Sequence, residues 1–337
     1  MLIFGQEIKR RHFLILTSFL LILFAIPLSV YLVQKQQIFK SRAVTMVRPP
    51  SEFEVGLEAG EQSDTGKVNL VAESKAKWVR LNFIGDDWTA SSSATKKYNQ
   101  IIDAYKAKRI NILGLIGAQS VAGGYDRTKP DDFIKKYVDA ADAIVNRFGD
   151  RVKAYELFNE PNDWAGGTNA QVPPDLFAKY LGRIYRKIKI DQKKLDIILN
   201  SGPVFSHDQD TGASYLEQTY SAGKNLSDPE ANWAKIKAET GSYPLDGIGY
   251  HIYVAQGMND QRQVEPKIKE NLNAFKSVIT MLDPGKKIWI SEFGWGTGTG
   301  RVTEEVQALN LEKAYTLLKG EPTVRMAMWF TLMDFDP

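Results

Sequence analysis

Residues 156–162 read Glu156-Leu157-Phe158-Asn159-Glu160-Pro161-Asn162, and they continue an apolar run that begins at Val152. The run has the composition of a buried strand. Pro161 ends it, because proline lacks the N–H that a strand ladder needs. The pattern predicts a strand that carries Asn159 and Glu160 at its C-terminal end.

A second stretch repeats this arrangement. Residues 288–295 read Ile288-Trp289-Ile290-Ser291-Glu292-Phe293-Gly294-Trp295. Again an apolar strand delivers one carboxylate at its end, and a glycine follows. A retaining glycosidase needs two such carboxylates, one as acid and then base and the other as nucleophile. We therefore expect Glu160 and Glu292 to act as a catalytic pair.

Strand-like and helical patterns alternate along the rest of the chain. The predicted strands are 53–57, 78–83, 110–116, 152–158, 196–200, 247–253, 287–292 and 326–330, and the predicted helices are 65–74, 94–108, 130–148, 174–190, 266–282 and 303–318. Residues 201–245 are long and less regular. Eight such strands predict an α/β fold, a (β/α)₈ TIM barrel. A doubly wound sheet is the alternative, but no G-x-G-x-x-G turn follows the first strand.

Active sites of such barrels lie at the C-terminal ends of the strands, and strands four and seven face one another across the mouth. Arg80 lies in the apolar second strand and needs a carboxylate partner, for which Glu292 is a candidate. His251 and Tyr253 alternate along strand six and should share one face. They are candidates to donate hydrogen bonds to Glu292 or to sugar hydroxyls.

Further side chains are candidates for binding a sugar. Asn159, beside the acid, is placed to bind a sugar 2-hydroxyl. Trp329 ends strand eight, and Trp164 and Trp295 lie on rim loops, where flat aromatic faces suit sugar rings. For the two loop tryptophans, loop packing is an equal alternative. Glu156 lies inside its strand, and we expect it to be a buried, hydrogen-bonded support.

These motifs resemble those of the clan A glycoside hydrolases. Asn159-Glu160-Pro161 after one strand and Ser291-Glu292-Phe293-Gly294 after a later strand are similar to that clan's acid/base and nucleophile motifs. Residues 155–162 are similar to the family 39 pattern, whereas the Arg80, His-x-Tyr and Trp329 features are shared with family 5, the cellulase-like group. The resemblance implies a TIM barrel with Glu160 as acid/base, Glu292 as nucleophile, and Arg80, Asn159, His251, Tyr253 and Trp329 as site residues.

The expected function is therefore retaining hydrolysis of β-glycosidic bonds in a poly- or oligosaccharide. One alternative is a non-catalytic carbohydrate-binding barrel at the cell surface. Another is a transglycosylase, which shares the first half of the reaction. The chemistry requires no metal or cofactor, and none is implied.

Composition limits the other partners. The chain has 337 residues, no cysteine and only three histidines, so thiolate chemistry is excluded and a histidine metal cluster is not expected. Residues 1–50 carry seven of the 43 basic residues and one of the 40 acidic ones. The remaining 36 basic and 39 acidic residues make the body weakly acidic, which gives no reason to expect nucleic acid as a partner.

Both ends of the chain carry separate expectations. Residues 13–33 contain no charge and are long enough to span a bilayer, and Lys9, Arg10 and Arg11 precede them. We expect a cytoplasmic segment (1–12), a signal-anchor helix (13–33), a linker (34–51) and an extracytoplasmic barrel (52–337), with a cleaved signal peptide as the alternative. Only seven residues follow strand eight, so the last barrel helix is expected to be missing.

Overall fold

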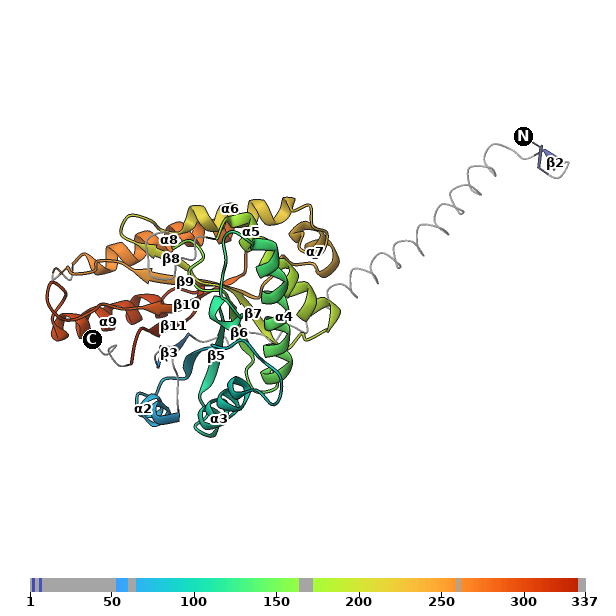
Figure 1. Cartoon of the computed structure of the whole chain (residues 1–337). Coiled ribbons are helices and arrows are strands. Elements are labelled where there is room, and N and C mark those ends of the chain that lie inside the picture. Colours follow the sequence, from blue (N-terminus) through green and yellow to red (C-terminus); the bar gives the residue numbers. More distant parts are fainter. Residues whose placement is uncertain are drawn as a thin grey trace. The chain divides into compact units, whose positions relative to one another are not determined.

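The computed structural model describes residues 2–3, 6–7, 53–59, 65–163, 172–258, 260 and 262–332. Eight parallel strand positions close into a barrel, because β10 pairs with both β9 and β11, and β11 pairs with β3 (Figure 1). The strands are β3 (Glu54–Glu58), β4 (Trp78–Asn82), β5 (Asn111–Ile116), β6 (Ala154–Leu157), β7 (Ile198–Ser201), β8 (Val204–His207), β9 (Gly247–Tyr253), β10 (Lys287–Phe293) and β11 (Val324–Trp329). The predicted TIM barrel is confirmed, and the doubly wound alternative is wrong.

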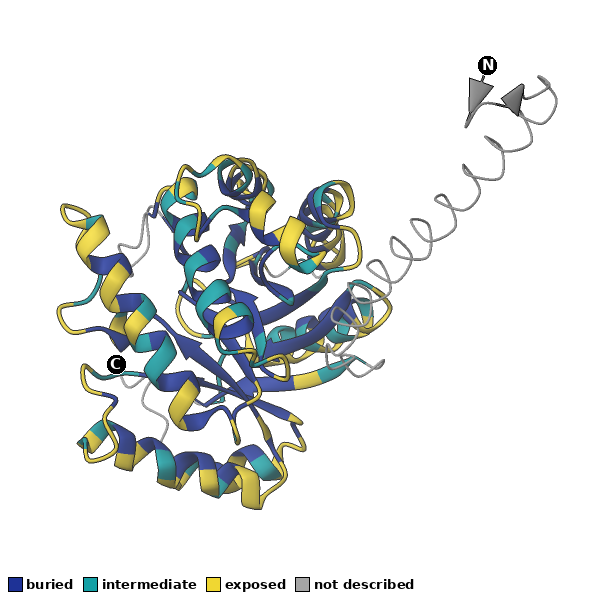
Figure 2. Cartoon of the chain, turned by 90° about the vertical axis from the view of Figure 1, so that its right-hand side faces the viewer, coloured by how far each residue is buried: buried dark blue, intermediate teal, exposed yellow. Residues whose placement is uncertain are grey.

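Helices surround the strands. They are η1 (Thr65–Lys67), α2 (Val68–Glu73), α3 (Ser93–Ala107), η2 (Ala118–Ser120), α4 (Pro130–Phe148), α5 (Pro174–Tyr185), the π-helical η3 (Arg186–Asp191), α6 (Ala213–Asn225), α7 (Trp233–Thr240), α8 (Val264–Leu282) and α9 (Glu304–Lys319). Helix α4 illustrates why these segments form helices that pack on the strands. Its apolar residues recur at helical spacing and are buried, among them Phe133, Tyr137, Ala141, Ile144 and Phe148. Figure 2 shows buried strands at the centre and helices whose outer sides are exposed.

The barrel interior has two levels. A small apolar cluster fills one level and consists of Trp78, Leu113, Ala154, Trp289, Met326 and Met328. All of them except Met328 lie in the first half of their strands, so the cluster occupies mainly the N-terminal side of the barrel. At the C-terminal ends of the strands, buried polar residues replace it, among them Arg80, Glu156 and Glu292. The apolar floor therefore leaves the polar groups gathered at the mouth.

The fifth barrel strand differs from the prediction. It was expected to end at Asn200, but β7 is followed after Gly202 and Pro203 by β8, which pairs in parallel with β9. A side chain at Gly249 would lie 2.6 Å from the Ser201 carbonyl oxygen and 2.8 Å from the Pro203 nitrogen. Glycine at position 249 therefore lets the Gly202-Pro203 link between β7 and β8 pack directly against β9.

The segment expected to be irregular also contains two helices, α6 and α7. Residues 201–245 therefore hold the strand extension and these helices in place of a loop. Trp233, the first residue of α7, is buried, and its indole donates a hydrogen bond to the Ala178 carbonyl on α5 at 3.0 Å. Packing against α5 thus fixes a helix whose own apolar periodicity is weak.

At the N-terminus, β1 (Leu2–Ile3) and β2 (Gln6–Glu7) form a two-stranded antiparallel ladder, which is described by itself. Residues 13–33, the predicted anchor, lie outside the described residues. Within the described part of the chain, no helix is long and apolar enough to cross a membrane. The description ends at Leu332, so the expectation of a missing last helix stays a prediction.

Candidate active site

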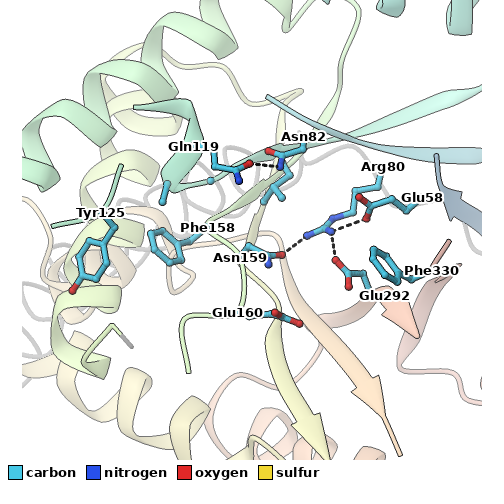
Figure 3. Close-up of a pocket in the computed structure, with 13 residues that line it drawn as sticks. Glu58, Arg80, Asn82, Gln119, Tyr125, Phe158, Asn159, Glu160, Glu292 and Phe330 are labelled. Atoms are coloured by element: carbon cyan, nitrogen blue, oxygen red, sulfur yellow. Dashed lines mark hydrogen bonds and ion pairs between the residues drawn. The ribbon is translucent and has the colours of Figure 1, made fainter. Parts of the chain in front are cut away.

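Arg80 is the centre of a buried polar network at the barrel mouth (Figure 3). Its Nε donates to Glu156 at 2.7 Å, its Nη1 donates to Glu58 at 2.9 Å and also to Glu292, and its Nη2 donates to the Asn159 Oδ1 at 2.7 Å. Burial lowers the pKa of Arg80, but the three carboxylates raise it well above its usual value. One permanent cation thus orients four side chains that come from β3, from β6 and the turn after it, and from β10.

Glu292 is held through both carboxylate oxygens. Arg80 donates to Oε1, and the Tyr253 hydroxyl donates to Oε2 at 2.7 Å. Burial raises the pKa of Glu292, whereas His251 and Arg80 oppose that rise. Burial and the Glu292 charge raise the pKa of Tyr253, so this hydroxyl keeps its proton and remains a donor. Both donors favour the ionised form of Glu292.

Glu160 projects from a strained turn. The φ angles of Phe158 and Glu160 are +81° and +43°, in the left-handed region that residues other than glycine rarely adopt. Phe158 is buried against the rings of Tyr125, Phe133 and Tyr137. This packing anchors the turn and directs the Glu160 carboxyl toward the mouth.

The Glu160 carboxyl is suited to carry a proton near neutral pH. Burial raises its pKa to about 7, with a further contribution from Asp163 and an opposing one from Arg80. Its Oε1 lies 2.7 Å from the His251 Nδ1. Burial lowers the pKa of His251 to about 4, so the imidazole is neutral at pH 7. The His251 Nε2 lies 3.1 Å from the Ser291 hydroxyl, which fixes the ring.

The two glutamates lie close together. One oxygen of Glu160, one ring nitrogen of His251 and one oxygen of Glu292 all lie within 4.8 Å of one another. This cluster has the composition of a metal site, but its contacts do not fit a cation. Both Glu292 oxygens already accept hydrogen bonds from Arg80 and Tyr253, and the adjoining Arg80 would repel a metal ion. The arrangement instead suits proton transfer and nucleophilic attack.

A cavity of about 310 Å³ opens over the carboxylates. Its charged and amide lining comes from seven residues, namely Glu58, Arg80, Asn82, Gln119, Asn159, Glu160 and Glu292, and the rings of Tyr125, Phe158 and Phe330 also contribute. Because the Asn159 Oδ1 accepts a hydrogen bond from Arg80, the side-chain amide of Asn159 is oriented so that its N–H groups can donate to a bound hydroxyl. Figure 3 shows Glu292, Glu58 and Phe330 on one side of this cavity and Tyr125 and Phe158 on the other.

The predicted tryptophans divide into three cases. Trp329 is half-buried, and its indole donates to the Thr331 carbonyl at 3.1 Å. Its neighbour Phe330 lines the cavity, whereas Trp329 does not. Trp295 is buried, and its indole donates to the Val254 carbonyl at 3.0 Å. This contact favours loop packing for Trp295 over a sugar contact. Trp164 lies outside the described residues.

Sequence reasoning missed several cavity residues. Glu58 is the last residue of β3, Glu292 is the last but one of β10, and Glu160 lies three residues after β6, which ends earlier than predicted. The first strand was predicted to stop one residue before Glu58. The same strand-end rule would have found it. Asn82 donates to Gln119 at 3.0 Å, and Gln119 belongs to the short helix η2. No local pattern indicates that η2 reaches the cavity. The expectation that Glu156 is a buried support is confirmed.

Comparison with known proteins decides the family. The family described as "Glycosyl hydrolase catalytic core" matches residues 126–336, which is more than half of the chain. The chain belongs to this family. The match includes Glu160, His251 and Glu292, and this glycosyl hydrolase is accordingly a glycosidase. The predicted relationship to the clan A glycoside hydrolases is confirmed, whereas the choice between families 39 and 5 stays open.

Solved structures share the fold of this glycosyl hydrolase. Xylanase B from Clostridium stercorarium F9 has 15% identity and a TM-score of 0.54, covering 83% of this chain and 86% of its own. A GH5-4 broad specificity endoglucanase from Clostridium longisporum has 13% identity and a TM-score of 0.54, with coverages of 83% and 86%.

A glucosidase from Croceicoccus marinus has 16% identity and a TM-score of 0.54 over 83% of this chain. The chain spans only 60% of that glucosidase's length. At these identities the likeness shows the fold alone. A search among curated protein sequences finds no match to this chain.

Proposed function

We propose that the protein is a retaining β-glycoside hydrolase that acts on a poly- or oligosaccharide. The observation that carries this proposal is the approach of the two glutamates, whose nearest oxygens lie within 4.8 Å. Retaining enzymes hold their carboxyl groups about 5–5.5 Å apart, whereas inverting enzymes separate them by about 6.5–9.5 Å to admit a water molecule. The solved structures named as xylanase, endoglucanase and glucosidase support a saccharide substrate.

In the first step, a Glu292 oxygen attacks the anomeric carbon and forms a covalent glycosyl ester. The bond from that carbon to the leaving oxygen breaks, and Glu160 gives this oxygen its proton. Two carboxylates this close share one proton at neutral pH. Because Arg80 and Tyr253 donate to both Glu292 oxygens, the shared proton belongs on Glu160.

In the second step, Glu160 takes a proton from water, whose oxygen attacks the anomeric carbon and releases Glu292. The neutral His251 donates from Nδ1 to the ionised Glu160 during this step. The presence of both carboxylates argues against a non-catalytic carbohydrate-binding barrel.

The acid role of Glu160 predicts a specific pH profile. Because its raised pKa lies at about 7, the protonated form is lost as pH rises through 7. We expect kcat/KM for substrates with poor leaving groups to fall about tenfold per pH unit above that value. In Glu160→Ala, activity on these substrates should fall about 10²–10⁴-fold, whereas dinitrophenyl glycosides retain much of theirs. An equal loss on both substrate types would refute the assignment.

We further propose that residues 13–33 anchor the protein in a membrane, with the barrel on the extracytoplasmic side. The support is the uncharged run of 21 residues after Lys9, Arg10 and Arg11. The full chain should remain in the membrane fraction after carbonate washing, and protease added outside should digest the barrel. A mature chain that begins after residue 33 would establish a cleaved signal peptide instead.

A further inference from the structure

The extension of the fifth barrel strand presents two aromatic side chains at the mouth. In the parallel pairing of β8 with β9, Phe205 is in register with His251 and His207 with Tyr253. Residues in register on neighbouring strands point to the same face of the sheet. Since His251 and Tyr253 contact the catalytic glutamates, Phe205 and His207 also point to the mouth. Both are half-buried, while Val204 and Ser206 are buried on the other face.

These rings continue an aromatic strip, which we define as Phe330, Tyr253, Phe205 and His207. Ring centroids are 6.4 Å apart between Phe330 and Tyr253, 5.9 Å between Tyr253 and Phe205, and 5.6 Å between Phe205 and His207. The strip starts beside Glu292, to which the Tyr253 hydroxyl donates. It therefore leads from the reacting centre out along the fifth strand.

Asn162 fixes the strip relative to the acid. Its Nδ2 donates to the Phe205 carbonyl at 2.8 Å, and its Oδ1 accepts from the Phe205 N–H at 2.8 Å. Asn162 is buried and lies two residues after Glu160. On the other side of β8, the Ser206 hydroxyl donates to the His251 carbonyl at 2.8 Å. The backbone of Phe205 is thus held on both sides next to the proton donor.

Apart from Phe330, which lines its wall, the strip lies outside the cavity over the carboxylates. The residues that line this cavity come from β3, β4, β5, β10 and the segments that follow β5, β6 and β11, and none comes from β8 or β9. Around the barrel, β8 and β9 occupy the arc that leads from Glu160 to Glu292 on the opposite side. A sugar attacked by Glu292 fits the polar cavity, so the group released by Glu160 has the arc of β8 and β9 available to it.

We propose that the aromatic strip, and Phe205 in particular, binds the leaving group as a second sugar unit. The flat apolar face of an equatorially substituted pyranose matches an aromatic ring. The enzyme would then act on a chain with sugar on both sides of the cleaved bond. The same site would hold an acceptor sugar during glycosyl transfer. This inference rests on the proposed retaining mechanism, because the acceptor role requires a covalent intermediate.

The test isolates the second half of the reaction. The full-length protein is converted to its covalent intermediate with 2-deoxy-2-fluoro glycosyl fluorides. Recovery of activity is then followed in buffer and with cellobiose, xylobiose or gentiobiose as acceptor. In the unmodified protein, at least one disaccharide should accelerate recovery in a saturable way. In Phe205→Ala, the ratio of acceptor-dependent to water-dependent recovery should fall about tenfold.

Three variants sharpen the result. Phe205→Tyr keeps the flat ring and should keep the ratio, whereas Phe205→Leu keeps an apolar core contact but should lose it. Met281→Ala, on the solvent side of α8, is the control and should match the unmodified protein. Thermal unfolding followed by circular dichroism checks that each variant is folded.

Several outcomes would overturn the inference. One is an unchanged ratio in both Phe205→Ala and Phe205→Leu. Another is a loss in Gln119→Ala alone, which would place the leaving group in the cavity. Failure of every disaccharide to accelerate recovery would also contradict it. If no covalent intermediate forms at all, the proposed mechanism itself fails, and this result is distinct from the others.

Discussion

Glu292→Gln is expected to lower turnover of every substrate on the order of 10⁵-fold, because it removes the atom that forms the covalent bond. The substitution is nearly isosteric. The Gln side chain can still accept hydrogen bonds through one oxygen, so the loss reports chemistry rather than collapse of the site. Steady-state assays with an aryl β-glycoside measure the effect.

Intact mass spectrometry provides the decisive readout for this variant. A mechanism-based 2-fluoro glycosyl label should add the mass of one sugar to the unmodified protein and none to Glu292→Gln. Glu58 is the matched control, because it is also a buried carboxylate that accepts from Arg80. Glu58→Gln should still take up the label. A label that persists in Glu292→Gln, or that maps to Glu58, would contradict the assignment of the nucleophile.

Arg80→Met is expected to lower the free energy of unfolding by about 3–5 kcal/mol, because it leaves buried carboxylates without their cation. Glu58, Glu156 and Glu292 are all buried and all accept from Arg80. Urea unfolding measures the change. A methionine fills much of the arginine volume, so the cost reflects charge rather than a cavity.

Two further variants separate this effect from general damage. Lys135→Met removes an ion pair with Asp139 whose side chains are 80% and 62% exposed, and it should change stability by less than about 0.5 kcal/mol. Adding Glu156→Gln to Arg80→Met should recover part of the lost stability, since it removes one uncompensated charge. A loss below about 1 kcal/mol in Arg80→Met would show that the network is not a structural requirement.

The barrel was predictable because most strands are largely apolar runs between helical patterns. The predicted limits of β9 (Gly247–Tyr253) and α4 (Pro130–Phe148) match the structure. The fifth strand was not fully predicted, because Gly202 and Pro203 interrupt its pattern. The strand can continue past these two residues only because Gly249, on the neighbouring strand, has no side chain that would clash with them. Such a dependence between distant residues leaves no local signal.

The same limit applies to the site. The strand-end rule predicted Glu160 and Glu292, and the alternation along strand six placed His251 and Tyr253 on one face. The sequence pattern could not predict that Arg80 also donates hydrogen bonds to Glu58, Glu156 and Asn159, because barrel closure decides which strand ends meet. Phe205 was missed for this reason, since its role depends on pairing with β9 and on Asn162.

The hydrogen bond from Arg80 to Glu292 joins residues that are 212 positions apart in the chain. Contacts of such long range form late, since the loop between them must first be closed. During synthesis, the intervening helices and strands emerge well before residue 292 does. The nucleophile is therefore oriented only after seven of the eight strand positions exist, so hydrolytic activity reports completion of folding more directly than helix content does.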